Sequence, residues 1–459
     1  MNKVKFAIIG AGSVCFSPKT VSDILLSKLF AELDVEIYLM DIAKEALEIS
    51  TAYCKKAAEM LNRKVTINHS TDLRAAVDSA NYVVTAIELD RYHYWSMDFH
   101  IPRKYGFRQV YGENGGPGGM FHTLRNLPPM LEIAEAMEQL CPDAWILNYT
   151  NPEAKLIEGI TKLTKINAVG LCHGVTMGQE QVAMFTGIPL YDIEFNCVGL
   201  NHFGWFTSIK DKNTGKDLYP FLLEREREAS MLSQWDEYAL SRFCLRTYGL
   251  WPYPAANHVG EYMAWSDQFL ASALIQYFHD PASENIWKNR NTPEFIYSFS
   301  QKPTDRLFFN TNNDSAGDPA YQEGFSIGEE GPYTSQEFGI RIAEALTFNV
   351  PYRVPAVNVI NKGYAEDLMP NMAIELPAEV DGHGLHPIKT DPLPTAIAAM
   401  INTQGAIHQL VLDAYVEKSR NKLLQALLLD PTISTYNNAV ALVNEMCDRQ
   451  KDILPEMHW

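Results

Sequence analysis

The sequence predicts an α/β fold, in which an N-terminal doubly wound parallel sheet is followed by a mixed α+β region. Short apolar segments alternate with amphipathic helical segments along the first part of the chain, which is typical of a parallel sheet covered by helices. This alternation stops near Gly174, where mixed segments rich in aromatic residues begin. We therefore divide the chain into residues 1–173 and 174–459 and place their junction within one globule.

The N-terminal region is expected to contain six strands and four helices. The strands are predicted at Val4–Ile9, Val35–Met40, Val65–His69, Tyr82–Ala86, Ala144–Asn148 and Ala168–Leu171. The helices are predicted at Thr20–Phe30, Ala43–Leu61, Leu73–Ser79 and Leu124–Leu140. Because the strands are nearly all apolar, helices should cover both faces of the sheet. This is a Rossmann-type arrangement, like that of lactate and malate dehydrogenases.

The C-terminal region is expected to be less regular. Phe195–Phe206 and Tyr248–Trp265 are predicted to be aromatic-rich loops, and Thr304–Tyr333 is predicted to be a mobile loop or an internal boundary. Strands are expected at Ala356–Ile360 and Met372–Val380, followed by a turn at Asp381–Gly384. From Thr395 onward the periodicity is helical.

Composition excludes several classes of protein. The 459 residues carry 38 Lys and Arg against 56 Asp and Glu, and the net charge of −18 would repel a nucleic acid. We expect no membrane span, because no apolar stretch is long enough to cross a bilayer. The apolar N-terminal run breaks at Gly10, so we expect a cytoplasmic protein. The seven scattered cysteines contain no CxxC pair, which argues against a disulfide framework or a structural zinc site.

The turn Gly10-Ala11-Gly12-Ser13 lies between a predicted strand and a predicted helix. Gly10 permits a tight turn, and Gly12 allows the backbone to approach a pyrophosphate at the helix N-terminus. Asp41 closes the second strand, where its carboxylate can accept hydrogen bonds from an adenosine ribose and would repel a 2′-phosphate. The pattern favours NAD over NADP. A turn without a dinucleotide, a flavin site or a nucleotide-sugar site remains an alternative.

Further polar residues follow later strands. Asn148 and Asn151 could bind a polyhydroxylated substrate or the nicotinamide ribose, although Asn-Pro is also an ordinary turn signal. Cys172 follows the sixth strand, and His202 lies in a short polar break of an apolar segment. Together they could hold one divalent cation and leave positions open for substrate. A packed thiol beside a surface imidazole is the alternative.

Two other segments attract attention. The segment Glu113–Gly119 is so rich in glycine that we expect an irregular loop, which either closes over a ligand or is flexible in solvent, with Arg125 shortly beyond it. The segment His258–Tyr262 carries an imidazole, a carboxyl and a phenol. These groups could transfer protons if they face a cleft, and are otherwise surface residues.

Taken together, these motifs resemble glycoside hydrolase family 4. The likeness is carried by Gly10–Ser13, Asp41, Gly116–Gly119, Asn148–Pro152, Cys172–Val175, Gly199–His202, Asn358–Gly363, Glu375–Ala378 and Leu429–Pro431, and it spans nearly the whole chain. It implies a glycosidase that needs NAD⁺ and a divalent metal, typically Mn²⁺, and that differs from two-carboxylate enzymes. In that family hydride moves from the sugar C3 to NAD⁺, C2 loses a proton and the C1 oxygen is eliminated. Water then adds and the hydride returns, so NAD⁺ is regenerated.

The resemblance also implies roles for single residues. Cys172 and His202 match the metal ligands, His173 matches the acid that protonates the departing oxygen, and Tyr262 matches the base at C2. The remaining matches are Gly10, Gly12, Ser13 and Asp41 at the cofactor, and Asn148 and Asn151 at the substrate.

The same resemblance suggests the substrate. His173 argues for an unphosphorylated α-glycoside, and Cys172-His173-Gly174-Val175 is nearest to the motif of α-galacturonidases. An α-galacturonide is therefore expected first, with Arg125 as a candidate to bind its carboxylate. α-Glucuronides, α-glucosides and α-galactosides are alternatives. Relatives by resemblance form homodimers or homotetramers. Rival hypotheses are an NAD-dependent 2-hydroxyacid dehydrogenase and an inactive NAD sensor.

Overall fold

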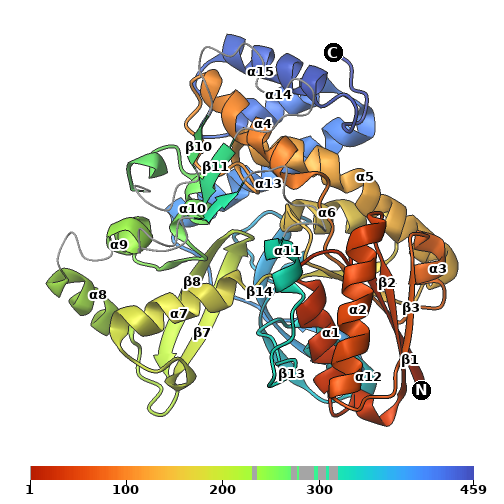
Figure 1. Ribbon diagram of the computed structural model, residues 1–459. Coiled ribbons are helices and arrows are strands. Elements are labelled where there is room, and N and C mark those ends of the chain that lie inside the picture. Colours follow the sequence, from red (N-terminus) through yellow and green to blue (C-terminus); the bar gives the residue numbers. More distant parts are fainter. Residues whose placement is uncertain (1, 230–234, 270–275, 279–293, 298–306, 310–318) are drawn as a thin grey trace.

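One large sheet runs through the computed structural model of the chain, with helices on both of its faces (Figure 1). The structure describes residues 2–229, 235–269, 276–278, 294–297, 307–309 and 319–459. Within these residues the large sheet has twelve strands, in the order β3-β2-β1-β4-β5-β6-β13-β14-β7-β8-β9, with β15 added beside β14. A separate sheet contains β10 (Gln276–Phe278), β11 (Glu294–Tyr297) and β12 (Leu307–Phe309).

The first six strands of this sheet are parallel and confirm the predicted Rossmann-type arrangement. They are β1 (Lys3–Ile9), β2 (Asp34–Met40), β3 (Thr66–Ser70), β4 (Tyr82–Thr85), β5 (Trp145–Asn148) and β6 (Asn167–Gly170). In β1, Phe6 and Ile8 pack into one hydrophobic core and Ala7 and Ile9 into another. Because successive side chains of a strand point to opposite faces, both faces of β1 are buried.

Six helices accompany these strands. They are α1 (Ser17–Leu26), α2 (Lys44–Met60), α3 (Leu73–Val77), α4 (Arg91–Lys104), α5 (Gly116–Leu140) and α6 (Glu153–Leu163). Residues of α1 and α2 belong to the first core, whereas residues of α3, α5 and α6 belong to the second. The sheet is therefore wound on both sides, as predicted.

The sheet continues into strands from the C-terminal region. These are β7 (Ile193–Leu200), β8 (Phe203–Asp211), β9 (Pro252–Tyr253), β13 (Tyr352–Ile360), β14 (Ala373–Asp381) and β15 (Gly384–Pro387). The prediction of a loop at Phe195–Phe206 is wrong, because most of this segment forms the hairpin of β7 and β8. Aromatic residues favour strands when they can pack, and Phe203, Trp205 and Phe206 are all fully buried.

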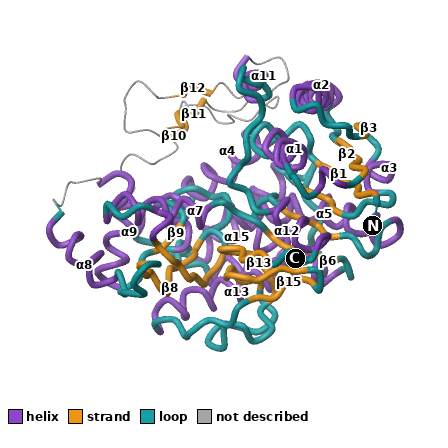
Figure 2. The backbone as a smooth tube through the Cα atoms, turned by 90° about the horizontal axis from the view of Figure 1, so that it is seen from below, coloured by secondary structure: helices purple, strands orange, loops and turns teal. Residues whose placement is uncertain are grey.

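The remaining helices cover the C-terminal strands and form a layer at the end of the chain (Figure 1). They are α7 (Gly174–Thr186), α8 (Tyr219–Glu228), α9 (Trp235–Tyr248), α10 (Ala256–Val259), α11 (Pro319–Gly324), α12 (Gly339–Phe348), α13 (Thr395–Glu417), α14 (Arg420–Leu429) and α15 (Tyr436–Arg449). In a perpendicular view the strands form a band with helices on either side (Figure 2). The predicted junction coincides with the start of α7. The division at residue 174 stays a prediction, since one sheet includes strands from both sides of it.

The prediction that Glu113–Gly119 is wholly irregular is wrong, because Gly116–Gly119 form the first turn of α5. A Cβ atom on Gly118 would lie 2.6 Å from the Gly112 carbonyl oxygen, and one on Gly119 would lie 2.4 Å from the Asn114 carbonyl oxygen. These glycines therefore serve close backbone packing rather than flexibility.

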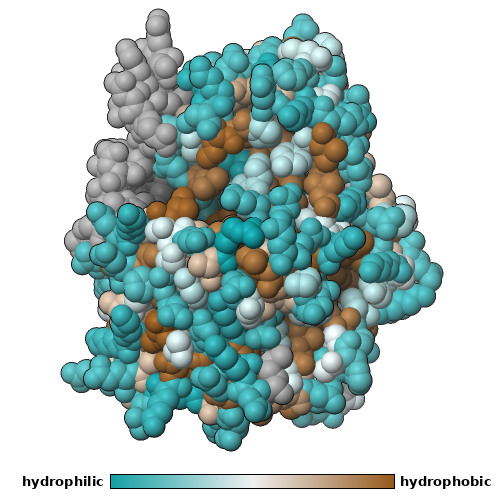
Figure 3. Space-filling model, turned by 90° about the vertical axis from the view of Figure 1, so that its right-hand side faces the viewer, coloured by the Kyte–Doolittle hydropathy of each residue, from teal (hydrophilic) through white to brown (hydrophobic). Residues whose placement is uncertain are grey.

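The surface agrees with the absence of a predicted membrane span. Among the described residues, none of the helices combines the length and the apolarity that crossing a bilayer requires. On the face drawn in Figure 3, hydrophobic residues form scattered patches between hydrophilic ones. Part of Thr304–Tyr333, the predicted mobile loop, lies outside the described residues.

Candidate active site

A single line of paired residues crosses the sheet and connects the predicted motifs. Its members are successive Cα partners on neighbouring strands: Met40, Ile9, Thr85, Asn148, Gly170, Asn358, Glu375 and Gly199. Gly10 and Asp41 come directly after this line, and Cys172 and Asn201 follow two residues beyond it. The sheet thus brings segments that are far apart in sequence to one edge, where ligands bind in doubly wound folds.

Neighbouring atoms lie so close to Gly10 and Gly12 that neither position has space for a side chain. Gly10 has a φ of +83°, and a Cβ atom there would lie 2.3 Å from the Ala86 carbonyl oxygen. The Gly12 N–H donates to the Asp41 carboxylate at 2.7 Å, and the Ser13 N–H donates to the Gly10 carbonyl at 2.9 Å. A Cβ on Gly12 would lie 2.9 Å from the same carboxylate. The assignment of this turn and Asp41 to the pyrophosphate and ribose of a dinucleotide stays a prediction.

Asp41→Ala is expected to weaken NAD⁺ binding about 10- to 100-fold, since a hydrogen bond to a charged group contributes about 1.5–3 kcal/mol. The preference for NAD⁺ over NADP⁺ should narrow, because the carboxylate no longer repels a 2′-phosphate. Asp41→Asn is the control, because it keeps an oxygen acceptor for the Gly12 N–H and removes only the charge. Fluorescence titration with both cofactors measures the effect, and unchanged dissociation constants would contradict the assigned role.

The two predicted amide residues differ in what they offer a ligand. Asn148 is fully buried; its Oδ1 accepts from Thr85 Oγ1 at 2.8 Å and from the Thr150 N–H at 3.0 Å. Its Nδ2 donates to the Thr150 carbonyl at 3.0 Å, so this amide holds the end of β5. The Asn151 side chain is partly exposed and makes no hydrogen bond with the described residues. Asn151 is therefore the better placed of the two to contact a substrate.

Glu261 joins the glycine-rich segment to the His258–Tyr262 segment. Its carboxyl accepts the backbone N–H groups of Glu113 at 2.5 Å and of Asn114 and Gly115 at 3.1 Å each. A Cβ on Gly115 would lie 2.7 Å from the Glu261 Cβ. Burial, together with the neighbouring Glu113 carboxylate, raises the pKa of Glu261 to about 8 despite these hydrogen bonds. Hydrogen bonds to the Glu261 carboxyl thus join the two segments.

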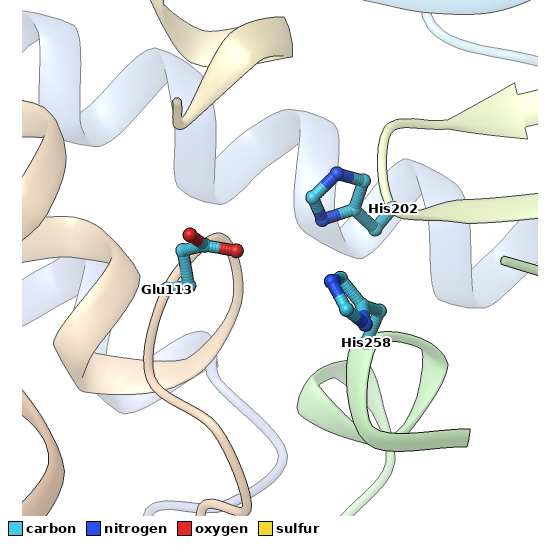
Figure 4. A group of neighbouring side chains, drawn as sticks. All are labelled: Glu113, His202 and His258. Atoms are coloured by element: carbon cyan, nitrogen blue, oxygen red, sulfur yellow. The ribbon is translucent and has the colours of Figure 1, made fainter. Parts of the chain in front are cut away.

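The two joined segments and the β7–β8 hairpin bring together three side chains that could bind a metal ion. Ligand atoms of Glu113, His202 and His258 all lie within 4.8 Å of one another, and the three side chains point toward a common space (Figure 4). Burial holds the pKa of His202 well below its usual value and lowers that of His258 to about 4. Both imidazoles are thus neutral near pH 7, the form that binds metal ions. One carboxylate and two imidazoles could hold a divalent transition-metal ion.

Neighbouring amides orient both imidazoles. His258 Nδ1 lies 2.6 Å from Asn257 Oδ1, and His202 Nδ1 lies 2.9 Å from the Asn114 side-chain amide. Asn114 Oδ1 is buried without a hydrogen-bond partner among the described residues. Asn114 Nδ2 also donates to Glu113 Oε2 at 3.3 Å, so this amide links Glu113 to His202.

Cys172 is not part of this group of three. It lies beside Asn201, the residue before His202, and its Sγ accepts the Gly174 N–H at 3.2 Å. Burial raises the pKa of this thiol well above its usual value, and the nearby carboxyls of Glu153 and Glu375 add to the effect. The pairing of Cys172 with His202 on one metal ion stays a prediction.

The predicted acid, His173, and the predicted base, Tyr262, contact different parts of the chain. His173 is partly exposed, and its Nδ1 lies 3.4 Å from Glu337 Oε1. The Tyr262 hydroxyl donates to the Asn201 carbonyl and accepts the His202 N–H, each at 3.2 Å. Burial raises the pKa of Tyr262 well above its usual value. Tyr262 thus lies beside the candidate metal ligands, but its role and that of His173 stay predictions.

Arg125 does not belong to this site. Its guanidinium is 1% exposed and forms an ion pair with Asp98, with 2.7 Å between Nη2 and Oδ2. Nη1 donates to Gln450 at 2.9 Å, and the guanidinium lies over the Tyr94 ring. Because Arg125 neutralises the fully buried Asp98 carboxylate, its guanidinium is not available to bind a substrate carboxylate.

Reasoning from the sequence missed three acids that organise the site. The sequence predicts Glu113 only as the start of a glycine-rich loop and Glu261 only as one member of a polar segment. It predicts no role for Glu337. The one signal for Glu113 and Glu261 is that each stands beside glycines or a histidine, whereas no local pattern marks Glu337.

Comparison with known protein families matches two segments of the chain. Residues 5–188 match the family 4 glycosyl hydrolase family, and residues 197–433 match the C-terminal domain of family 4 glycosyl hydrolases. The chain belongs to glycoside hydrolase family 4. This assignment confirms the resemblance seen in the motifs and makes the protein a glycosidase.

Family 4 enzymes with different names are similar to the chain to nearly the same degree. An α-glucosidase of Erwinia rhapontici is 30% identical, over 97% of this chain and 98% of that enzyme. An α-galactosidase of Bacillus subtilis is 30% identical, over 99% and 100%. An α-galacturonidase of Thermoanaerobacter italicus is 28% identical, over 98% and 97%. Overall identity therefore does not separate these sugars.

Solved structures agree on the fold. A 6-phospho-α-glucosidase from gut microorganisms, in complex with NAD and Mn²⁺, has a TM-score of 0.79 at 21% identity, over 99% of this chain and all of that chain. A lactate dehydrogenase of Cryptosporidium parvum has a TM-score of 0.52 at 13% identity, over 90% and 99%. The second likeness confirms the dehydrogenase-like fold of the N-terminal sheet and says nothing of activity.

Proposed function

We propose that this family 4 enzyme is an NAD⁺- and Mn²⁺-dependent α-glycosidase that acts on an unphosphorylated sugar, with α-galacturonides as the first substrate class. One observation carries the proposal. The dinucleotide-type turn, His173 and His202 follow strands of the large sheet, and ligand atoms of Glu113 and His258 lie within 4.8 Å of one on His202. A dehydrogenase of 2-hydroxy acids would have no use for this cluster.

The chain's own residues bind and orient the two cofactors. Gly10, Gly12 and Ser13 would hold the pyrophosphate, and Asp41 would hold the adenosine ribose. His202 and Cys172 would hold the metal ion, with Glu113 and His258 as further ligands around His202. When bound, NAD⁺ accepts hydride from the sugar C3, and the cation stabilises negative charge that develops on the sugar oxygens. The solved 6-phospho-α-glucosidase with NAD and Mn²⁺ supports this cofactor pair.

Proton transfers are assigned to His173 and Tyr262. His173 is partly exposed at the start of α7, where it can donate a proton to the departing glycosidic oxygen. The Tyr262 hydroxyl lies against the backbone of Asn201 and His202, beside the metal group, which is where the C2 proton must be removed.

The choice of an unphosphorylated uronide rests on local motifs. His173 and the run Cys172-His173-Gly174-Val175 support it. Arg91 replaces Arg125 as the candidate cation, because its side chain is 30% exposed and lies 2.5 Å from Glu113 within the metal group. A guanidinium there could bind a sugar carboxylate.

The test is a panel of 4-nitrophenyl α-galacturonide, α-glucuronide, α-glucoside and α-galactoside, each with and without NAD⁺ and Mn²⁺ under reducing conditions. We expect the α-galacturonide to be cleaved fastest, with both cofactors required and no net NADH. Deuterium at C2 or C3 should slow turnover if chemistry limits the rate. Turnover without NAD⁺ or net NADH would overturn the mechanism, faster cleavage of another sugar would overturn the substrate, and no turnover would indicate an NAD sensor.

A further inference from the structure

His173 faces a carboxylate that comes from a distant part of the chain. Its Nδ1 lies 3.4 Å from Oε1 of Glu337, which stands just before α12. The Glu337 side chain is 5% exposed, whereas that of His173 is 41% exposed. The Nδ1 edge of the imidazole therefore faces the protein interior, and the rest of the ring is partly accessible from solvent.

The backbone at Glu337 is held in place from α1. The Glu337 N–H donates to Ser335 Oγ at 3.0 Å. Ser335 in turn donates twice to Asp23 on α1, from its N–H at 2.7 Å and from its Oγ at 2.5 Å. This clamp fixes the point from which the Glu337 side chain reaches His173.

Glu337 has a cationic partner besides His173. Lys19 Nζ on α1 lies 3.1 Å from the same oxygen, Oε1. Burial acts to raise the pKa of Glu337, but the hydrogen bond and charge of His173 and the charge of Lys19 outweigh it and hold the pKa below its usual value. Oε2 is buried without a hydrogen-bond partner among the described residues. The carboxylate is thus ionised and aimed at the imidazole.

We propose that Glu337 is a positioning residue that accepts the His173 Nδ1–H and so directs Nε2 at the departing glycosidic oxygen. An imidazolium whose Nδ1–H is held by a carboxylate keeps one ring orientation, with its Nε2–H directed away from that carboxylate. The inference rests on the proposed role of His173 as the acid. It adds a residue that touches neither sugar nor cofactor and acts only through His173.

The proton transfer balances without any further reactant. His173 acts as the imidazolium, with a proton on each ring nitrogen. Its Nε2–H bond breaks and an O–H bond forms on the departing oxygen, which leaves with the electron pair of the C1–O bond. The Nδ1–H stays on His173, hydrogen-bonded to Glu337, and the ring becomes neutral imidazole. His173 regains a proton from the water that later adds to the sugar.

The test compares two glycosides of the same sugar that differ in how much they need an acid. A 4-nitrophenyl group leaves readily as its anion, whereas a methoxide must be protonated. In Glu337→Gln the ratio of kcat for the 4-nitrophenyl over the methyl glycoside should rise at least about 10-fold over wild type, because acid catalysis contributes about 10²–10⁴-fold. KM should change little. Glu337→Asp, which keeps a carboxylate, should restore part of the loss.

Glu344→Gln on α12 is the matched control, because Glu344 accepts from Ser27 and does not contact His173. It should leave the ratio unchanged. Equal loss on both glycosides in Glu337→Gln, with a normal unfolding temperature, would overturn the inference alone. If Glu337→Gln does not fold, Glu337→Ala decides, since an unchanged ratio in that variant, which has no carboxylate, would also overturn the inference. No turnover by the wild type on either glycoside would overturn the proposed function, and this inference with it.

Discussion

His202→Ala is expected to lower metal-dependent glycoside turnover at least about 1,000-fold, because a catalytic metal supplies several kcal/mol of charge stabilisation. His202 is the residue common to the structural group with Glu113 and His258 and to the predicted pair with Cys172. Its loss should also abolish tight Mn²⁺ binding, measured by titration calorimetry. NAD⁺ affinity should stay within about twofold of wild type, because the glycine turn lies on other strands.

Two further variants decide which side chains share the ion with His202. If Cys172 is a ligand, Cys172→Ser should weaken Mn²⁺ binding as His258→Ala does; if only the group with Glu113 binds, Cys172→Ser should keep wild-type affinity. His408→Ala is a matched control. His408 on α13 is also a buried imidazole, but it lies beside Glu158 on α6. Wild-type Mn²⁺ affinity in His202→Ala would refute both ligand sets.

Arg125→Met is expected to lower the free energy of unfolding by about 3–5 kcal/mol, the usual cost of removing one partner of a buried ion pair. The change leaves Asp98 fully buried without its 2.7 Å partner and removes the hydrogen bond to Gln450. KM for the glycoside should not change, because the guanidinium is buried and is bound by Asp98 and Gln450. Denaturant unfolding and steady-state kinetics measure the two quantities.

Replacing both charges should separate the ion pair from the packing around it. In Arg125→Met with Asp98→Leu, no unpaired charge remains, so much of the lost stability should return. A surface control is Lys389→Met, whose ion pair with Glu366 is exposed and should contribute little. An Arg125→Met protein of normal stability with a strongly raised KM would return Arg125 to the substrate site.

The strands of the N-terminal region could be predicted to within one residue, and helices α2 and α3 to within two. Helix α1 begins three residues and ends four residues before its predicted limits, α5 begins eight residues before its predicted start, and α6 was not predicted. Strands such as β1 and β5 are buried on both faces, so they are apolar runs that end at polar residues or glycine. Helix α4 (Arg91–Lys104) was missed, because Ser96 and Asp98 are buried in it and obscure the apolar periodicity. The hairpin of β7 and β8 was mistaken for a loop because its aromatic side chains are buried only by distant elements.

The sequence by itself determined the dinucleotide turn, the positions of the parallel strands along the chain and the motifs of family 4, because each depends on residues close together in the chain. Only the tertiary structure decided which side chains meet. The pairing of Asn358, Glu375 and Gly199 across the sheet aligns segments far apart in sequence. The packing of loops and helices gathers Glu113 with two histidines, sets Glu337 against His173 and pairs Arg125 with the buried Asp98. Such encounters depend on long-range packing and charge neutralisation, which leave no local pattern.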